Sequence, residues 1–146
     1  MSESVVKIKL CPGGIAPRRM SSGAVGFDIF AHLDEPIKLS PGKRCVVPAG
    51  FVIEIPGGYE AQIRPRSGWA LKHGLTMLNS PGTIDPDYRG EVKVILANLG
   101  ENDIIISNGE RIAQMVLAAV PKVKFELVDS LSDSSRGENG FGSTGI

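Results

Sequence analysis

The stretch Gly82-Thr83-Ile84-Asp85-Pro86-Asp87-Tyr88-Arg89-Gly90 lies between two apolar runs, Leu75 to Leu78 and Val92 to Ala97. Its glycines and its proline are turn residues, so the stretch predicts a β-hairpin crossing rather than a helix. The backbone N–H and C=O groups of such a tip can read the edge of a small planar ligand. An acid (Asp85) and an aromatic ring (Tyr88) on the same segment are what a nucleoside site needs. A solvated turn has the same composition, so this second interpretation stays open at this point.

Composition limits the class of protein. The 146 residues correspond to one domain, and a hydrophobic content of 42% predicts a folded chain. The 18 glycines and 10 prolines favour many short strands joined by tight turns. The formal net charge is zero, so no global field attracts nucleic acid or an anionic membrane, and we expect neither partner. An anionic ligand must therefore meet local cations.

The two cysteines, Cys11 and Cys45, do not have the spacing of metal ligands. The sequence shows no signal peptide and no long apolar run. Reduced thiols and a cytoplasmic location are the expectation.

Alternating apolar and polar residues predict a series of short strands, separated by glycine and proline at intervals of about ten residues. This pattern is typical of an all-β sandwich or barrel. Asn108-Gly109 is a hairpin signal between two of the strands. The expected strands cover Val6–Leu10, Phe27–Ala31, Cys45–Val47, Phe51–Ile55, Tyr59–Ile63, Val92–Ala97, Ile104–Ile106, Glu110–Leu117 and Val123–Leu127.

A single helix is expected between Arg64 and Gly74, with Ser67 as its N-cap and Gly74 as its terminator. A helix start beside Arg64 and Arg66 is an anion site in one interpretation and an ordinary capped helix with exposed arginines in the other. We interpret Trp69 as a packing residue and His73 as a surface residue.

Two polar side chains interrupt otherwise apolar strands. Asp28 lies between Phe27 and Ile29, and Gln114 lies within the strand that follows Asn108-Gly109. A buried carboxylate or amide needs a partner, because leaving it unpaired is costly. The alternative for Asp28 is a position at a strand edge that faces water.

The composition changes at Asp129, which divides the chain into a β domain over residues 1–128 and a mobile arm over residues 129–146. The end of the arm, Arg136 to Ile146, is nearly all glycine and hydroxyl residues with one aromatic. Glycine-rich backbone can wrap phosphate oxygens as a nest. A disordered tail without a role is the alternative that composition alone favours.

Five blocks together resemble those of the homotrimeric dUTP pyrophosphatases (dUTPases), in the order of that family and over most of the chain. Each block is moderately specific, and all five in sequence are very specific. The blocks are Ala24-Val25-Gly26-Phe27-Asp28, Pro65-Arg66-Ser67-Gly68, Gly82 to Gly90, Asn108 to Gln114, and Arg136 to Gly145.

The resemblance implies a jelly-roll-like β-sandwich or barrel with one short helix and a flexible C-terminal arm. It implies a homotrimer with sites shared between subunits. The implied reaction is Mg²⁺-dependent hydrolysis of dUTP to dUMP and pyrophosphate. This activity lowers the dUTP available for incorporation into DNA and supplies dUMP for thymidylate synthesis.

The resemblance also implies roles for individual residues. Asp85 would position and deprotonate the attacking water, and Tyr88 would lie under the deoxyribose and crowd out a 2′-OH. The backbone near Thr83 and Ile84, with Asn79 close by, would bind uracil.

On the phosphate side, Gln114 would bind near the α-phosphate, and Asp28 would act through water on a Mg²⁺ held mainly by the triphosphate. The arm would close over the nucleotide, with Phe141 stacking on uracil. The other implied substrate-binding residues are Arg66, Ser67, Gly68, Lys93, Arg136, Gly142, Ser143 and Thr144.

Three positions depart from the common family pattern: Phe27 for tyrosine, Trp69 for leucine and Asn139 for glycine. Arg111 is left as structural or interfacial. Two other functions fit the same scaffold, a dCTP deaminase and a non-catalytic trimeric nucleotide-binding or regulatory module. Ammonia release from dCTP would identify the first, and dUTP binding without pyrophosphate release would identify the second.

Overall fold

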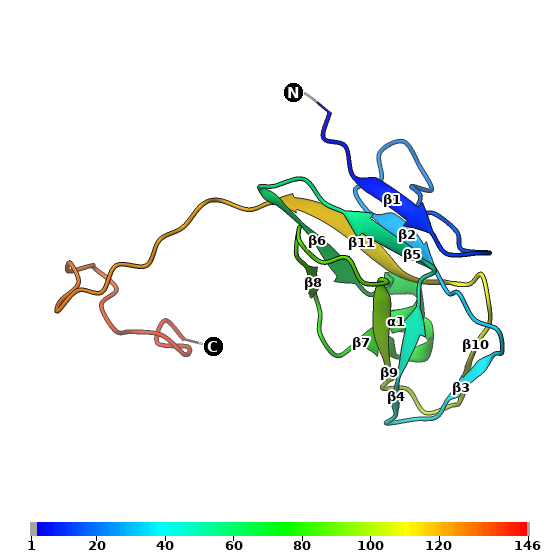
Figure 1. Ribbon diagram of the computed structural model, residues 1–146. Helices are drawn as coiled ribbons and strands as arrows, with labels where there is room; N and C mark the ends of the chain where they lie inside the picture. Colours follow the sequence, from blue (N-terminus) through cyan, green and yellow to red (C-terminus); the bar gives the residue numbers. More distant parts are fainter. Residues whose placement is uncertain (1–2, 146) are drawn as a thin grey trace.

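The computed structural model describes residues 3–145, which form short strands and one short helix (Figure 1). The elements, in chain order, are β1 (Lys7–Leu10), β2 (Phe27–Phe30), β3 (Ile37–Leu39), β4 (Arg44–Pro48), β5 (Phe51–Glu54), β6 (Tyr59–Arg64), α1 (Ser67–His73), β7 (Leu75–Met77), β8 (Gly82–Ile84), β9 (Lys93–Asn98), β10 (Ile104–Ile106) and β11 (Arg111–Ala119).

The strands pair antiparallel throughout these elements. A four-stranded sheet has the order β2-β11-β6-β8, and a three-stranded sheet has the order β4-β9-β7. Two further pairs, β1 with β5 and β3 with β10, complete the arrangement. The predicted all-β fold with one short helix is confirmed. Within the described chain, no helix is long and apolar enough to cross a membrane.

The core lies between the sheets and follows from period-two alternation. On β6, Ala61 and Ile63 are buried, and on β9, Val94 and Leu96 are buried. Burying a side chain as large as Ile63, Val94 or Leu96 stabilises the fold by about 1.5–3 kcal/mol relative to leaving it exposed. Asn98 is also fully buried, and its amide donates to the carbonyls of Leu39 (2.9 Å) and Asn102 (2.8 Å).

The opposite face of the four-stranded sheet is polar. Along β6, the amide of Gln62 donates to Glu60 Oε1 (2.8 Å), and Arg64 donates to Gln62 Oε1 (2.6 Å). Strand pairing places Gln114 opposite Arg64 and Thr83 opposite Gln62. The polar positions of neighbouring strands therefore share this face, which carries most of the candidate site.

The central stretch is more open than the hairpin expected from the sequence. Its two flanking runs do pair, with Leu75 opposite Asn98 and Met77 opposite Leu96. The connection between them, however, contributes β8 to the other sheet, where β8 pairs with β6. The prediction of a tight hairpin is therefore wrong, because Gly82 to Ile84 leaves the β7–β9 pair and adds to β6 in the other sheet.

Asn108-Gly109 forms a turn, with Gly109 at φ 79°, but not a hairpin. The strands on its two sides belong to different sheets, since β10 pairs with β3 and β11 pairs with β2 and β6. The turn is held by long-range contacts instead. Gly109 N donates to Ala31 O (2.8 Å), and Leu33 N donates to Asn108 Oδ1 (3.0 Å).

The strand expected over Val123–Leu127 is also wrong. The last strand ends at Ala119, and the following residues leave the body as an extended chain (Figure 1). Their apolar side chains are largely exposed in the described chain: Val123 is 77% exposed, Phe125 94% and Leu127 99%. The alternation that predicts a strand is present, but a strand needs a partner.

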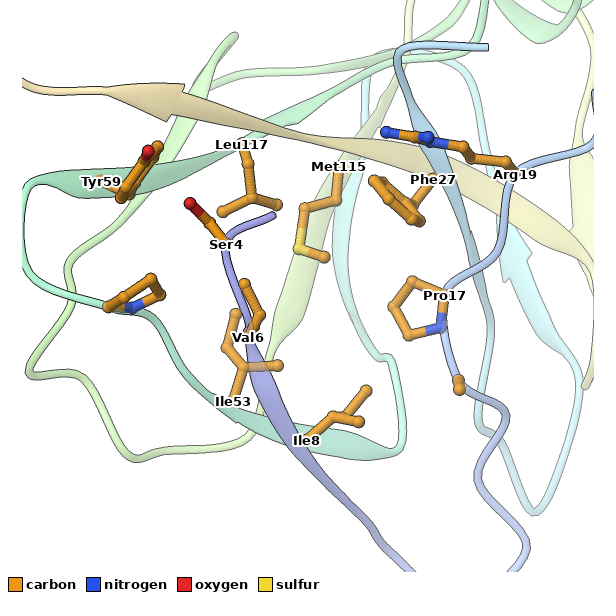
Figure 2. Close-up of a pocket in the computed structure, with 12 residues that line it drawn as sticks. Ser4, Val6, Ile8, Pro17, Arg19, Phe27, Ile53, Tyr59, Met115 and Leu117 are labelled. Carbon is orange, nitrogen blue, oxygen red and sulfur yellow. The ribbon is translucent and has the colours of Figure 1, made fainter. Parts of the chain in front are cut away.

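An apolar groove lies between β1 and the four-stranded sheet, with a volume of about 340 Å³ (Figure 2). Val6 and Ile8 line it from one side, and Met115 and Leu117 from the other. The Arg19 guanidinium lies over the Phe27 ring at its edge, 4.6 Å from the centroid. The groove contains none of the predicted site residues.

Candidate functional site

Asp28 is the centre of a charged cluster at one end of the polar face. It lies opposite Gln114 in the β2–β11 pairing. Its Oδ2 is 3.1 Å from Arg111 NH1, its Oδ1 is 3.7 Å from Arg66 Nε, and its side chain is 15% exposed. The expectation that this carboxylate needs a partner is confirmed, with two guanidinium groups rather than one.

Arg66 and Trp69 tie the helix to β11. Arg66 NH1 and Trp69 Nε1 both donate to the Arg111 carbonyl, each at 3.1 Å. Arg66 is itself the N-cap residue, in extended conformation, and no side chain caps the helix. The prediction of Ser67 as N-cap is therefore wrong: Ser67 is the first residue of α1, exposed beside Gly68. Gly74 ends the helix in the left-handed region (φ 69°), as predicted.

Gln114 lies beside the cluster with its amide oriented by backbone. Its Nε2 donates to Pro65 O (3.1 Å), which confirms that this strand amide has a partner. Gly26 leaves room for it, because a Cβ at position 26 would lie 2.4 Å from Gln114 Oε1. Asp28, Arg66 and Gln114 thus form one group on a single chain.

The central stretch supplies an exposed backbone edge. β8 lies at the edge of the four-stranded sheet, so the outward N–H and C=O groups of Gly82 to Ile84 face no further strand in the described chain. Ile84 is buried and Thr83 is exposed. Asn79 lies beside Gly82, whose Cβ would be 3.2 Å from Asn79 Nδ2. This edge can pair with the polar rim of a planar ligand.

Asp85 follows β8 directly and is exposed. Tyr88 N donates to Asp85 O (3.1 Å), and Tyr88 OH donates to Glu91 O (3.0 Å), so the tyrosine ring is held at both ends. Position 90 must be small, since a Cβ there would lie 2.3 Å from Tyr88 OH. Asp85 also borders a hollow of about 350 Å³, together with Tyr59 and the first residues after β11.

These two groups are far apart within one chain. Continuing the β6–β8 register places Asp85 level with Glu60, and Asp28 is level with Arg64 through β11. Three strand spacings across and four residues along give roughly 20 Å between Asp28 and Asp85. Both side chains stand off the same face of the sheet, so neither shortens this distance.

The remaining predicted residues lie elsewhere. Lys93 is exposed on β9, opposite Pro48. The arm has a local turn in which Arg136 Nε donates to Asn139 O (2.7 Å), and Asn139 N donates to Arg136 O (3.2 Å). Phe141 is fully exposed at φ 50°, followed by Gly142, Ser143 and Thr144. In Figure 1 the chain after β11 extends away from the strands.

The residues fit a Mg²⁺ that arrives with a phosphate ligand better than a resident ion. Within residues 3–145, no three His, Cys, Asp or Glu side chains gather as metal ligands. Both oxygens of Asp28 already face guanidinium groups. Mg²⁺ in phosphate sites commonly keeps several waters and uses few carboxylates, which agrees with contact through water.

Lowered carboxyl pKa values occur at strand pairs away from the polar face. Lys7 donates to Glu54 Oε1 (3.0 Å) and lowers the pKa of that carboxyl. Lys38 lowers the pKa of Asp103 in the same way, at 2.8 Å. Both pairs are solvated, so they contribute little to stability.

Sequence reasoning missed three members of the Asp28 cluster. Sequence patterns assign no chemical role to Arg111 or to Gly26, and they indicate only packing for Trp69. The available signal for Gly26 was its two-residue spacing from Asp28, which puts both on one side of an extended segment. Nothing in the sequence indicated that the Arg111 carbonyl would accept two donors.

Comparison with known proteins gives one consistent answer. The dUTPase family model matches residues 13–145. A deoxyuridine 5′-triphosphate nucleotidohydrolase of Bdellovibrio bacteriovorus is 56% identical over 99% of each chain. One from Treponema denticola is 52% identical over 94% of this chain and 96% of the relative.

A solved structure agrees in fold. The Staphylococcus bacteriophage 80alpha dUTPase G164S mutant with dUpNHpp has a TM-score of 0.88 and 27% identity, over 97% of this chain and 99% of that one. The jelly-roll-like expectation is confirmed by this likeness together with the strand pattern. The chain belongs to the dUTPase family.

Proposed function

We propose that this chain hydrolyses dUTP to dUMP and pyrophosphate in a homotrimer whose sites combine residues from different subunits. One observation carries the proposal. The backbone edge with Asp85 and the charged group around Asp28 are complementary parts of a nucleotide site, yet they lie roughly 20 Å apart in one chain. A neighbouring copy brings the missing half to each of them.

The Asp85 half binds the nucleoside. The outward backbone groups of β8 pair with the polar edge of uracil, with Asn79 and Thr83 beside them. A cytosine in that place presents a donor where an acceptor is needed and leaves buried groups unpaired, which rejects it strongly. The Tyr88 ring, fixed by its bond to Glu91 O, supports the deoxyribose and excludes a 2′-OH.

Asp85 acts as the general base in this proposal. Asp85 is exposed directly after β8, and a positioned carboxylate can accept a proton from the water that attacks the α-phosphorus. The oxygen of that water forms the new bond to phosphorus, the bond to the bridging oxygen breaks, and pyrophosphate leaves.

The Asp28 half binds the phosphates. Arg66, the first-turn N–H groups of Ser67 and Gly68, and the Gln114 amide face a phosphate chain from one side. Lys93 stays a predicted phosphate contact, although it lies on β9 of the other sheet. Mg²⁺ would be held by the triphosphate, with Asp28 reaching it through water, and would neutralise charge that develops on the phosphate oxygens. Gln114 holds the α-phosphate in line with the water, and Arg66 binds the phosphates beyond it.

The arm completes the proposed site. Residues 129–146 act as a mobile cover, with Phe141 stacking on uracil and Arg136, Gly142, Ser143 and Thr144 binding phosphate oxygens. The exposed apolar residues Val123, Phe125 and Leu127 support assembly, because an extended segment of this kind is stabilised by another chain. The arm therefore begins where contacts with a neighbour end.

The test is pyrophosphate release from dUTP against dCTP, dTTP and UTP, with Mg²⁺ present. dUTP should be the substrate by a wide margin, and ammonia release from dCTP would identify a deaminase instead. Asp85→Asn should lower turnover by roughly 10²-fold or more, as expected for loss of a general base. It should leave dUTP affinity within about tenfold, since an amide keeps the shape and most contacts of the carboxyl. A cytoplasmic location is part of the same proposal, in keeping with Cys11 and Cys45 as free thiols.

A further inference from the structure

Helix α1 carries the phosphate-binding residues of the proposed site on very little packing. It has seven residues, none of them buried, with no acid in its first turn and no side-chain cap. A helix this short is not stable without tertiary contacts. Its position relative to β11 must therefore come from a few specific bonds.

Trp69 makes one of those bonds. The indole N–H donates to the Arg111 carbonyl at 3.1 Å, and the ring packs against the edge of the core. Arg66 NH1 donates to the same carbonyl at 3.1 Å, so both lone pairs of this oxygen are used. Arg66 and Trp69 are three positions apart, which places them on neighbouring turns at the start of the helix.

Through this shared acceptor, Trp69 fixes where the Arg66 guanidinium lies. The Arg66 Nε atom is 3.7 Å from Asp28 Oδ1, which is longer than a direct hydrogen bond. Arg111 makes the closer contact to Asp28, at 3.1 Å. Arg66 is thus held near Asp28 mainly by its bond to the Arg111 carbonyl, and it keeps donors for a ligand.

We propose that Trp69 is a positioning residue that aims Arg66 at the distal phosphates of the nucleotide. The inference rests on the proposed dUTP site and adds a determinant of triphosphate affinity to it. Of the contacts that Trp69 makes, packing needs only an apolar side chain, whereas the bond to the Arg111 carbonyl needs the indole N–H.

The test uses Trp69→Phe, which keeps an aromatic ring packed against the core and removes only the indole N–H donor. Isothermal calorimetry would measure the Kd of dUpNHpp, which has three phosphorus atoms, and that of dUMP, which has only the α-phosphate. Loss of one hydrogen bond corresponds to a change on the order of threefold to tenfold. We expect that weakening for dUpNHpp and no change for dUMP.

Leu71→Ala is the matched control, because Leu71 lies on the same helix and is 88% exposed. It should change neither Kd. Equal weakening of both ligands by Trp69→Phe, or weakening of neither, would overturn the positioning role. Wild-type pyrophosphate release from dUTP is measured in parallel, so failure of the proposed function is seen separately.

Fluorescence gives a second readout. Trp69 is the only tryptophan in the chain, so its emission reports on this one position. Emission should shift when dUpNHpp binds to the wild type and stay constant when dUMP binds. An identical response to both ligands would contradict an effect transmitted from the distal phosphates.

Discussion

Mixing two inactive variants should restore activity if the site is shared. Asp85→Asn removes the proposed base, and Arg66→Gln removes the proposed phosphate cation while keeping a long polar side chain. Asp85 lies level with Glu60 of β6. Glu60 in turn precedes Arg66 by six residues, and Arg66 follows the end of β6. At about 3.3 Å per residue this separation is roughly 20 Å, whereas Asp85 and Arg66 must both lie within contact distance of one bound triphosphate.

The expected yield follows from the closed symmetry of a trimer. Each site needs Asp85 from one chain and Arg66 from a neighbour in a fixed direction. With random one-to-one assembly, about a quarter of the sites contain both intact groups. Each variant alone should retain on the order of 1% of wild-type turnover or less. The mixture should therefore recover about a quarter of wild-type activity, as measured by pyrophosphate release after co-expression with two different tags.

A matched control distinguishes sites that are shared between chains from sites that lie within single chains. The double variant Asp85→Asn/Arg66→Gln is mixed with wild type in the same ratio. Shared sites predict about a quarter of wild-type activity, since both contributing chains must be wild type, while sites within single chains predict about half. Recovery no higher than the two parents in the first mixture, together with half activity in the second, would refute the shared site.

Three further outcomes are expected. Deleting residues 136–146 should leave the melting temperature nearly unchanged, because this segment contributes no core, and should abolish most turnover; a large fall in melting temperature would make it structural. Gly90→Ala should move the Tyr88 ring and raise turnover of UTP relative to dUTP. Gly57→Ala is the control, because a Cβ there meets nothing within 4 Å, and it should not change this ratio. The same UTP-to-dUTP turnover ratio in both variants would show that Tyr88 does not select the sugar. Chelation of Mg²⁺ should stop turnover without lowering the melting temperature of the nucleotide-free protein, since the described chain has no cluster of metal ligands; a drop would indicate a resident ion.

Local alternation predicted most strands correctly because it depends only on which side of the chain is buried. Ala61 and Ile63 on β6 have that pattern, and the structure buries both. Local alternation does not predict which strands pair. A turn that joins two paired strands can have the same local sequence as a turn that connects two sheets, and Asn108-Gly109 is of the second kind.

The same limit explains the error at Val123–Leu127. The alternation there is genuine, but its partner is absent from the chain itself, so the single chain shows an extended segment with 94% of Phe125 exposed. Sequence patterns report the burial that a segment requires and not which molecule provides it. In the proposed homotrimer a neighbouring chain would cover these apolar side chains.

The site residues divide along the same line. Asp28 and Gln114 could be singled out because a polar side chain inside an apolar strand requires a partner, and both found one. The Arg111 carbonyl could not be singled out from the sequence, because its role depends on where a short helix packs against the sheet. The catalytic half and the phosphate half are each complete locally, at opposite ends of one polar sheet face. In the proposed homotrimer a second chain brings them within reach of one bound nucleotide.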